Sequence, residues 1–262
     1  MSFLDTIKEK LLKIKPIQYY VLGKFYLNDR FYINGQKRDE IERKKDPSRT
    51  EIINYILSLF DTKTTYLEIG VRDPTLNFDH IKAGKKYSVD PGIEFEENPV
   101  DFALTSDEFF EALKNEKILS KEIKFDVIFI DGLHLAEQVD KDIKNSLKYI
   151  KEDGYIVLHD CNPPTEWHAR VEHNYKFTPA HSNWNGTTWK AFLKWRCNEL
   201  INSCCIDSDW GVGILSKTQP IGKNIDKINK FYEYDALNNN RKEYLNLITF
   251  EEFKKKIKII RS

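Results

Sequence analysis

The sequence has no excess of charge of either sign and no long hydrophobic run. Lys plus Arg and Asp plus Glu number 41 each, so the formal net charge is zero. Proteins that bind duplex nucleic acid use a surplus of Lys and Arg to displace counterions, and this sequence has no such surplus. No apolar stretch approaches the roughly 20 residues that cross a bilayer. We therefore expect a soluble, cytoplasmic protein with no membrane span and no nucleic-acid partner.

Cysteine is also scarce, and this excludes two kinds of small structural site. The four cysteines are Cys161, Cys197, Cys204 and Cys205, too few for a disulfide framework in a chain of 262 residues. No C-x-x-C pair has a second pair elsewhere, so the sequence does not indicate a structural zinc site. We expect these cysteines to be reduced and to act as small hydrophobic side chains in the core.

The sequence does contain enough apolar material for a full core. Hydrophobic residues make up 40% of the chain and aromatic residues 13%, which excludes global disorder. The length fits one domain of ordinary size with additions at both ends. We expect a helical and aromatic extension over residues 1–47, a central domain over 48–217 and a helical extension over 218–262.

The first 50 residues carry few signals of regular structure beyond one amphipathic stretch. Apolar residues between 3 and 14 recur at helical spacing, and Pro16 is expected to end that helix. The pair Asn34-Gly35 predicts a turn. Residues 36–49 are charged with mixed sign, which is typical of a solvated linker. Ser48 followed by Glu51 then predicts a capped start of a helix.

The central region alternates between short apolar runs and helical periodicity. The runs predict strands over 65–70, 86–90, 100–104, 125–131 and 155–160, and an antiparallel pair over 204–207 and 213–216. Apolar residues at helical spacing predict a helix over 136–150. The pattern predicts an α/β fold with a doubly wound, mostly parallel, seven-stranded sheet, closed by an antiparallel hairpin.

The residues that follow the strands are the candidate site, because open α/β sheets bind ligands beyond the carboxyl ends of their strands. A glycine there lets the backbone approach a ligand, and an acid after the second strand suits a ribose diol. No G-x-G-x-x-G follows the first strand, which disfavours a nucleotide-sugar oxidoreductase that uses NAD. The residues at these strand ends are Glu68, Gly70, Asp90, Ser106, Asp107, Asp131, His159 and Asp160.

The motifs LEIG, SVD, TSD, FDVIFIDGLH and GYIVLHD, closed by a hairpin, resemble class I S-adenosylmethionine-dependent methyltransferases over about residues 48–217. The pair FIDGLH and LHD is similar to the small metal-assisted O-methyltransferases, which include sugar methyltransferases of the macrocin and mycinamicin type. The resemblance implies S-adenosylmethionine as the methyl donor. It also implies transfer to a hydroxyl of a sugar, or of a glycoconjugate or polysaccharide precursor.

The same resemblance implies how the cofactor would be held. Glu68 and Gly70 would line its methionine end, and Asp90 would hold the ribose hydroxyls. Ser106 and Asp107 would face the adenine.

The resemblance further implies the catalytic groups. His134 would be the general base, and Asp131 would take part both in catalysis and in contact with the cofactor. Asp131 and Asp160 would also be the ligands of a divalent metal such as Mg²⁺. One alternative stays open, because Cys161 follows Asp160 where the family commonly has an acid or an amide. In that alternative the two carboxylates orient other groups or cap turns, and no metal is bound.

A long loop over residues 161–186 is expected to carry the specificity for the acceptor. Its candidate acceptor-binding residues are Glu166, His168 and Arg170, joined by Lys190 from the helix that follows. Arg170 and Lys190 could bind the phosphate of a nucleotide-linked sugar. Two alternatives remain: methylation of a capsular phosphoramidate precursor, and a non-catalytic binding module of the same fold. The sequence is compatible with a homo-oligomer.

Overall fold

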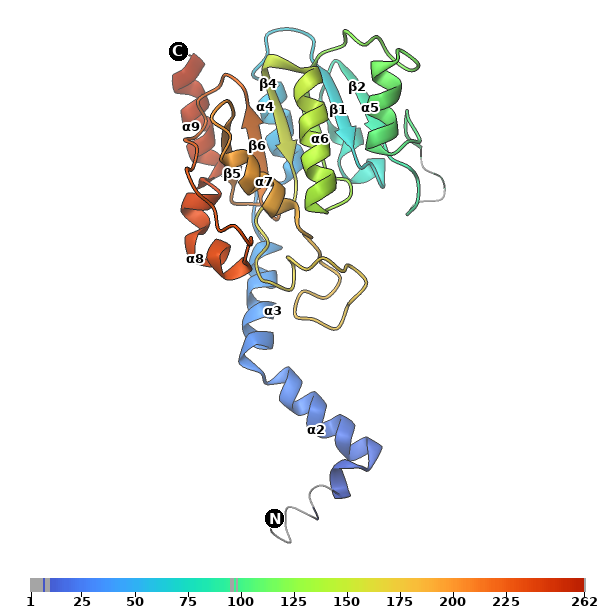
Figure 1. The fold of residues 1–262 in the computed structure, drawn as a ribbon, viewed down its shortest axis with the longest axis vertical. Helices are drawn as coiled ribbons and strands as arrows, with labels where there is room; N and C mark the ends of the chain where they lie inside the picture. The colour runs from blue at the N-terminus through green and yellow to red at the C-terminus, as the bar shows by residue number, and fades with distance from the viewer. Residues whose placement is uncertain (1–6, 8–9, 95–96, 98, 262) are drawn as a thin grey trace.

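The computed structural model describes residue 7, residues 10–94, residue 97 and residues 99–261, and a seven-stranded sheet forms its centre (Figure 1). The strands are β1 (Thr65–Ile69), β2 (Lys85–Val89), β3 (Phe125–Ile130), β4 (Ile150–Leu158), β5 (Asn202–Ile206), β6 (Val212–Ser216) and β7 (Leu247–Ile248). Their order is β2-β1-β3-β4-β6-β5-β7, and β6 runs antiparallel to both of its neighbours. The predicted α/β fold with a mostly parallel sheet and an antiparallel hairpin is confirmed.

One of the seven predicted strands is wrong, and another takes its place at the opposite edge. Residues 100–104 form only an isolated bridge, between Val89 and Phe102. The side chain of Asp101 accepts hydrogen bonds from the backbone and hydroxyl of Ser88, which replace part of a ladder there. The seventh strand is β7, which comes from the segment after residue 217 and pairs with β5.

Helices cover both faces of the sheet. They are α4 (Arg49–Leu57), α5 (Ser106–Lys114), α6 (Ala136–Tyr149), α7 (Thr188–Arg196), α8 (Tyr234–Tyr244) and α9 (Phe250–Arg261). Helices α5 to α8 pack on one face and α4 with α9 on the other. The predicted start of α4 is confirmed, since Ser48 and Glu51 form both bonds of a capping box.

The central strands read as continuous apolar runs because both of their faces are covered. In β3, Ile128 and Ile130 pack into the core beneath α5 to α8, while Val127 and Phe129 pack into the core beneath α4 and α9. All six residues of β3 are buried. The residues that follow this strand are therefore held on a rigid base.

Helices α2 (Lys15–Leu27) and α3 (Arg30–Glu42) extend away from the sheet as an arm (Figure 1). The helical residues before Pro16 end at Leu12, as expected, and Pro16 lies in the first turn of the next helix, α2, where its missing N–H costs nothing. One expectation for this part is wrong. Asn34 and Gly35 lie inside α3, whose start is capped by Asp29. Half of the helix expected between residues 3 and 14, namely residues 3–6, 8 and 9, lies outside the described residues.

Residues 36–49 are not a solvated linker. Most of them belong to α3 or to its junction with α4, and Asp39 and Glu42 are buried. Asp39 pairs with Arg43, and Glu42 pairs with Lys45. Both acids also bond to the body of the protein, so their charge marks a buried contact between the arm and the body. No helix among the described residues is long and apolar enough to cross a bilayer.

Candidate active site

A cleft of about 1020 Å³ opens at the carboxyl ends of the parallel strands. It lies where β1 has β2 on one side and β3 on the other, which is the switch point at which open α/β sheets bind ligands. The structure brings all the predicted cofactor residues to the wall of this one cleft: Glu68, Gly70, Asp90, Ser106, Asp107 and Asp131.

The turn after β1 approaches the end of β3 so closely that it requires glycine. Gly70 has a φ of +93°, and a Cβ on it would lie 2.3 Å from the carbonyl oxygen of Asp131 and 2.4 Å from the Cα of Gly132. Other residues would be strained at this φ and would also clash. The backbone at Gly70 can therefore form the floor of the cleft beside Asp131.

The carboxylate of Glu68 is buried and is held by two hydrogen bonds. Its Oε2 accepts a hydrogen bond of 2.6 Å from the hydroxyl of Tyr66 and one of 2.9 Å from the amide of Asn77. Burial raises the pKa of Glu68 to about 7, although both hydrogen bonds lower it. Glu68 is thus fixed in orientation and titrates near neutral pH.

The other end of the cleft offers acidic and polar groups at the ends of β2 and α5. Asp90 follows β2, and its carboxylate accepts a bond of 2.7 Å from the backbone of Gly92. Burial raises the pKa of Asp90. Asp107 stands in the first turn of α5, where Gln138 donates to its carboxylate and lowers its pKa. This arrangement suits the ribose and the base of a nucleoside.

His134 stands at the centre of the cleft, between two carboxylates and an aromatic ring. Its Nε2 lies 3.4 Å from Oδ1 of Asp131, and its Nδ1 lies 3.2 Å from Oδ2 of Asp160 and 3.1 Å from the carbonyl oxygen of Trp184. The imidazole also stacks on Trp184, with ring centroids 5.2 Å apart. Burial lowers the pKa of His134, but Asp160 and Asp131 raise it by more, to about 9.

A second histidine holds the same carboxylates from beneath. His159 Nδ1 lies 3.2 Å from Oδ1 of Asp131 and 3.1 Å from Oδ2 of Asp160, and its Nε2 lies 3.1 Å from Oδ1 of Asp209. Burial lowers the pKa of His159, but Asp131 and Asp160 raise it well above the ordinary value. Arg49 completes the cluster, with its Nε 3.7 Å from Oδ2 of Asp131.

Sequence reasoning missed Arg49 and Asp209 entirely, and it noted His159 only as a residue at a strand end. Arg49 begins α4, and Asp209 lies in the turn between β5 and β6, so neither follows a parallel strand. The backbone N–H of Arg49 donates to Asp209 over 2.6 Å. No motif in the sequence marks either residue, because their role depends on where α4 and the hairpin pack.

Three of these side chains could hold a divalent cation. Asp131, His134 and Asp160 each place one ligand atom within 4.8 Å of the others. Two carboxylates with one imidazole are a donor set that fits a hard or intermediate cation. Cys161 is buried and points away into the core, and the amide of Asn162 is bonded to Arg241 and Asp207. Around this site, three acidic side chains pair with three basic ones. These are Asp131, Asp160 and Asp209 with Arg49, His134 and His159.

The loop over residues 161–186 does line the cleft, but through residues other than the predicted ones. None of the four predicted acceptor residues is on the wall of the cleft. His168 is buried and bonds to Asp39 and Thr165, and so joins the loop to the arm. Arg170 donates to backbone carbonyls of the loop itself, including that of Asn183.

The other two predicted acceptor residues also lie apart from the cleft. Glu166 is exposed, and the ammonium group of Lys190 lies 5.4 Å from the centroid of the Trp189 ring. The loop instead presents a different set of side chains, none of which is among the predicted site residues. These are His173, Asn174, Lys176, Ser182, Asn183 and Trp184.

Comparison with known proteins gives one family match and several distant structural similarities. Residues 74–161 match the family model described as a methyltransferase domain. An O-methyltransferase from Bacillus cereus, solved in complex with SAH, is 14% identical, with 77% of this chain and 97% of that chain covered and a TM-score of 0.42. A Podospora anserina methyltransferase with SAH is also 14% identical, with 78% and 97% covered and a TM-score of 0.40.

A third solved structure is a methyltransferase of the mycinamycin biosynthetic pathway, in complex with Mg, SAH and mycinamycin VI. It is 12% identical, with 91% of this chain and 67% of that chain covered and a TM-score of 0.42. No curated protein sequence matches the chain significantly. Residues 74–161 thus match a methyltransferase domain, and the motifs at the strand ends and the cleft at the switch point agree with a class I S-adenosylmethionine-dependent methyltransferase.

Proposed function

We propose that this methyltransferase acts on a hydroxyl of a sugar or of a glycoconjugate precursor, with His134 as the general base. One observation carries the proposal. His134 lies between Asp131, on the cofactor side of the cleft, and Trp184, on the side formed by the long loop. A base at this junction could reach the hydroxyl of an acceptor that lies against the loop.

The reaction needs the donor methyl group to be aligned with the acceptor oxygen, and it needs the proton of the acceptor hydroxyl to be removed. The methyl carbon leaves the sulfonium sulfur of S-adenosylmethionine and forms a bond with the acceptor oxygen, and S-adenosylhomocysteine remains. The hydroxyl proton passes to a ring nitrogen of His134. Because a hydroxyl is a weak nucleophile, a base within about 2.6–3.2 Å contributes most as the bond forms. Holding donor and acceptor together in the cleft would supply the in-line geometry.

The carboxylates beside His134 set the conditions under which it can accept a proton. With a pKa of about 9, the imidazole is mostly protonated at neutral pH, because the charges of Asp131 and Asp160 beside it favour the protonated form. The two carboxylates could hold a divalent cation beside His134, whose ring nitrogen must stay off the cation to accept the proton. When bound, such a cation would offset the carboxylate charge and help to acidify the acceptor hydroxyl.

A sugar acceptor is supported by the side chains that the loop presents. Trp184 offers a flat face whose orientation is fixed by a hydrogen bond of 2.7 Å from its indole N–H to the carbonyl of Arg170. The imidazole ring of His173 lies tilted against the indole of Trp184, with the two ring centroids 5.2 Å apart. Asn174 and Ser182 add amide and hydroxyl groups to this wall. Sugars combine an apolar ring face with many hydroxyls, and this wall offers a partner for each.

A methyl-transfer screen tests the proposal. The purified chain is incubated with S-adenosylmethionine labelled in the methyl group and with nucleotide sugars, free oligosaccharides, a sugar phosphoramidate and a catechol. We expect label in a sugar hydroxyl, located by fragmentation mass spectrometry. Label on the catechol alone would overturn the sugar assignment, and label on nitrogen would overturn O-methylation. If S-adenosylmethionine binds but no acceptor is labelled, the result would favour the non-catalytic binding module over the enzyme.

A further inference from the structure

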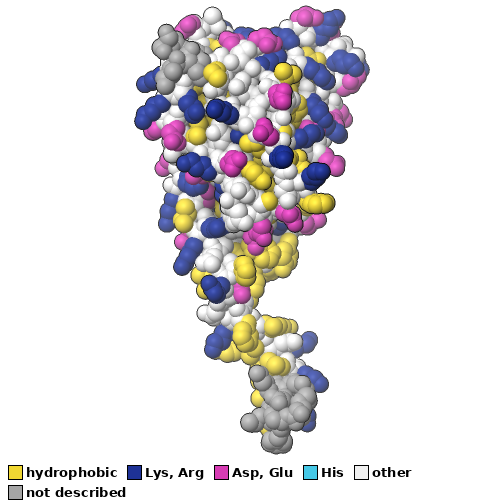
Figure 2. Space-filling view, turned by 60° about the vertical axis from the view of Figure 1, so that its left-hand side comes forward, with side chains coloured by type: hydrophobic (Ala, Val, Ile, Leu, Met, Phe, Trp, Pro, Cys, Tyr) yellow, Lys and Arg dark blue, Asp and Glu magenta, His cyan; other side chains and the backbone are white. Residues whose placement is uncertain are grey.

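The arm formed by α2 and α3 exposes an apolar surface that the rest of the described chain does not cover. No residue of α2 is buried. Figure 2 shows hydrophobic side chains gathered along the arm below the body of the protein. We call residues 14–31 the apolar arm. Its large exposed side chains, each between 44% and 74% accessible, are Ile14, Tyr19, Tyr20, Leu22, Phe25, Tyr26, Leu27 and Phe31.

The apolar side chains of α2 surround the helix instead of forming one stripe. Tyr19, Tyr20, Leu22 and Phe25 project in different directions, because successive residues of a helix are turned by about 100°. A helix that lies on a membrane surface needs a polar face opposite its apolar one, and α2 has none. With 13 residues, α2 is about 20 Å long, shorter than the roughly 30 Å hydrocarbon core of a bilayer. A protein partner that wraps the arm fits these facts.

The exposed area matches what a stable dimer buries. At roughly 200 Å² for a fully buried aromatic side chain, the five exposed rings offer about 650 Å². The exposed Ile14, Leu22 and Leu27 extend this surface. A standard interface buries about 800 Å² on each partner, so the apolar arm by itself comes close to one half of such an interface. A monomer seldom leaves a patch of this size in water.

We propose that two copies of this chain dimerise through their apolar arms, and that this pairing steadies the loop that lines the acceptor side of each cleft. A second copy supplies a matching surface of the same area, as two-fold pairing requires. The proposal does not depend on which acceptor is methylated.

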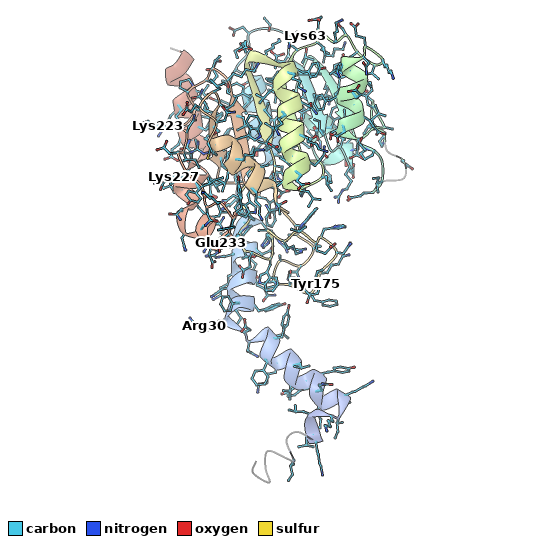
Figure 3. The ribbon with its side chains drawn as sticks, in the orientation of Figure 1. Arg30, Lys63, Tyr175, Lys223, Lys227 and Glu233 are labelled. Atoms are coloured by element: carbon cyan, nitrogen blue, oxygen red, sulfur yellow. The ribbon has the colours of Figure 1, made fainter. Side chains whose placement is uncertain are left out.

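The contacts between the arm and the loop provide the route to the cleft. The hydroxyl of Tyr26 donates to the carbonyl of Phe177 over 2.7 Å. Gly35 lies against Pro179, where a Cβ on the glycine would be 2.5 Å from the proline side chain. In Figure 3, Tyr175 lies at the edge of the loop on the side from which the arm extends, and Arg30 marks the junction of α2 with α3.

The arm also holds a residue of the cleft wall directly. Asp39 of α3 accepts a bond of 2.7 Å from the amide of Asn183, and one of 2.9 Å from His168. Asn183 lines the cleft. A partner that fixes the arm would therefore fix both ends of the loop segment between Phe177 and Asn183.

Sedimentation velocity of the full chain tests the pairing. We expect wild type to have twice the mass of the 31.0 kDa chain, and the double variant Tyr20→Glu, Phe25→Glu to have the mass of one chain. Both substituted side chains are exposed, so circular dichroism should show an unchanged fold. Phe231→Glu is the matched control, because Phe231 is 83% exposed but lies outside the apolar arm, and this variant should stay dimeric.

Two results would overturn the proposal. One is a wild-type mass that the double substitution leaves unchanged, whether of one chain or of several. The other is a single-chain wild type that floats with vesicles of phosphatidylcholine and phosphatidylglycerol, which would assign the arm to a membrane. Hydrogen exchange tests the second part: amides over residues 171–184 should exchange faster in the double variant than in the Phe231→Glu control. Equal exchange rates in the two variants would show that dimerisation does not steady the loop.

Discussion

Nδ1 of His159 lies 3.2 Å from Oδ1 of Asp131, across the ends of the neighbouring strands β4 and β3. This contact keeps the central carboxylate of the cleft charged. Burial raises the pKa of Asp131, but His159, His134 and Arg49 lower it by more, to well below its ordinary value. Asp131 is therefore an anion at any pH at which the enzyme would work, and it can hold a cation or orient His134 without changing its own protonation.

His159 should matter for stability more than for chemistry. His159→Gln removes one of the cationic groups that compensate Asp131, Asp160 and Asp209, and loss of one partner of a buried ion pair costs about 3–5 kcal/mol. Because the pKa of His159 is raised on folding, its contribution is complete below pH 6.5 and is lost as the pH rises through the folded-state pKa. Urea unfolding at neutral pH measures the loss. The exposed His181 provides the control His181→Gln, and equal midpoints for the two variants would contradict the prediction.

His134→Ala should lower kcat by about 10²–10⁴-fold, the usual contribution of a positioned base. The affinity for S-adenosylmethionine should barely change, because no contact of His134 with the donor is proposed. Single-turnover rates and calorimetric donor titrations measure the two quantities separately. His181→Ala, in the same loop region but off the cleft wall, should keep normal turnover. Unchanged kcat in His134→Ala would reject the base, and lost donor binding would indicate a structural role.

The pH dependence of kcat should show the titration of His134. Only the neutral imidazole accepts a proton, and the pKa of His134 is about 9. In enzyme freed of divalent cations, kcat should therefore rise with pH and level off above about 9. His134→Ala should lose this rising limb. If the wild-type kcat stays constant as the pH rises to about 9, another group removes the proton.

Asp90→Ala should weaken binding of S-adenosylmethionine. Asp90 lies on the cleft wall after β2, where a carboxylate would accept bonds from the ribose hydroxyls. A hydrogen bond to a charged group contributes on the order of 1.5–3 kcal/mol, so the dissociation constant should rise by at least about tenfold. Isothermal titration calorimetry measures it, with Asp79→Ala at an exposed position as the control. Equal affinities would reject the ribose assignment.

Removal of divalent cations should lower activity in part. Asp131 and Asp160 offer hard oxygen ligands, but Arg49, His134 and His159 already compensate their charge. We therefore expect a weak site, and EDTA treatment followed by added Mg²⁺ should lower and then restore the rate. Asp160→Asn should make the enzyme insensitive to EDTA. Full wild-type activity after exhaustive chelation would leave both carboxylates with an orienting role.

The sequence predicted the ends of the central parallel strands because local rules govern them. A parallel strand buried on both faces reads as an apolar run, and its end fixes which residue comes next at the sheet edge. Glu68, Asp90 and Asp131 follow from that rule alone, and the structure brings them to one cleft. The start of α4 followed from the spacing of Ser48 and Glu51 for a similar reason, since a capping box is a contact between near neighbours.

The acceptor half and the charge cluster were decided by packing between distant segments. Arg49 and Asp209 meet His159 only because α4 and the turn after β5 pack against the end of β4. His168 reads as a loop residue open to a ligand, yet Asp39 of the arm buries it. Charged residues between 36 and 49 likewise resemble a linker until their partners in the body are known. The sequence by itself determined most of the strands and the residues that end them, since these depend on local periodicity. Only the tertiary structure decided which polar residues face the cleft, because burial and ion pairing depend on contacts between segments far apart in the chain.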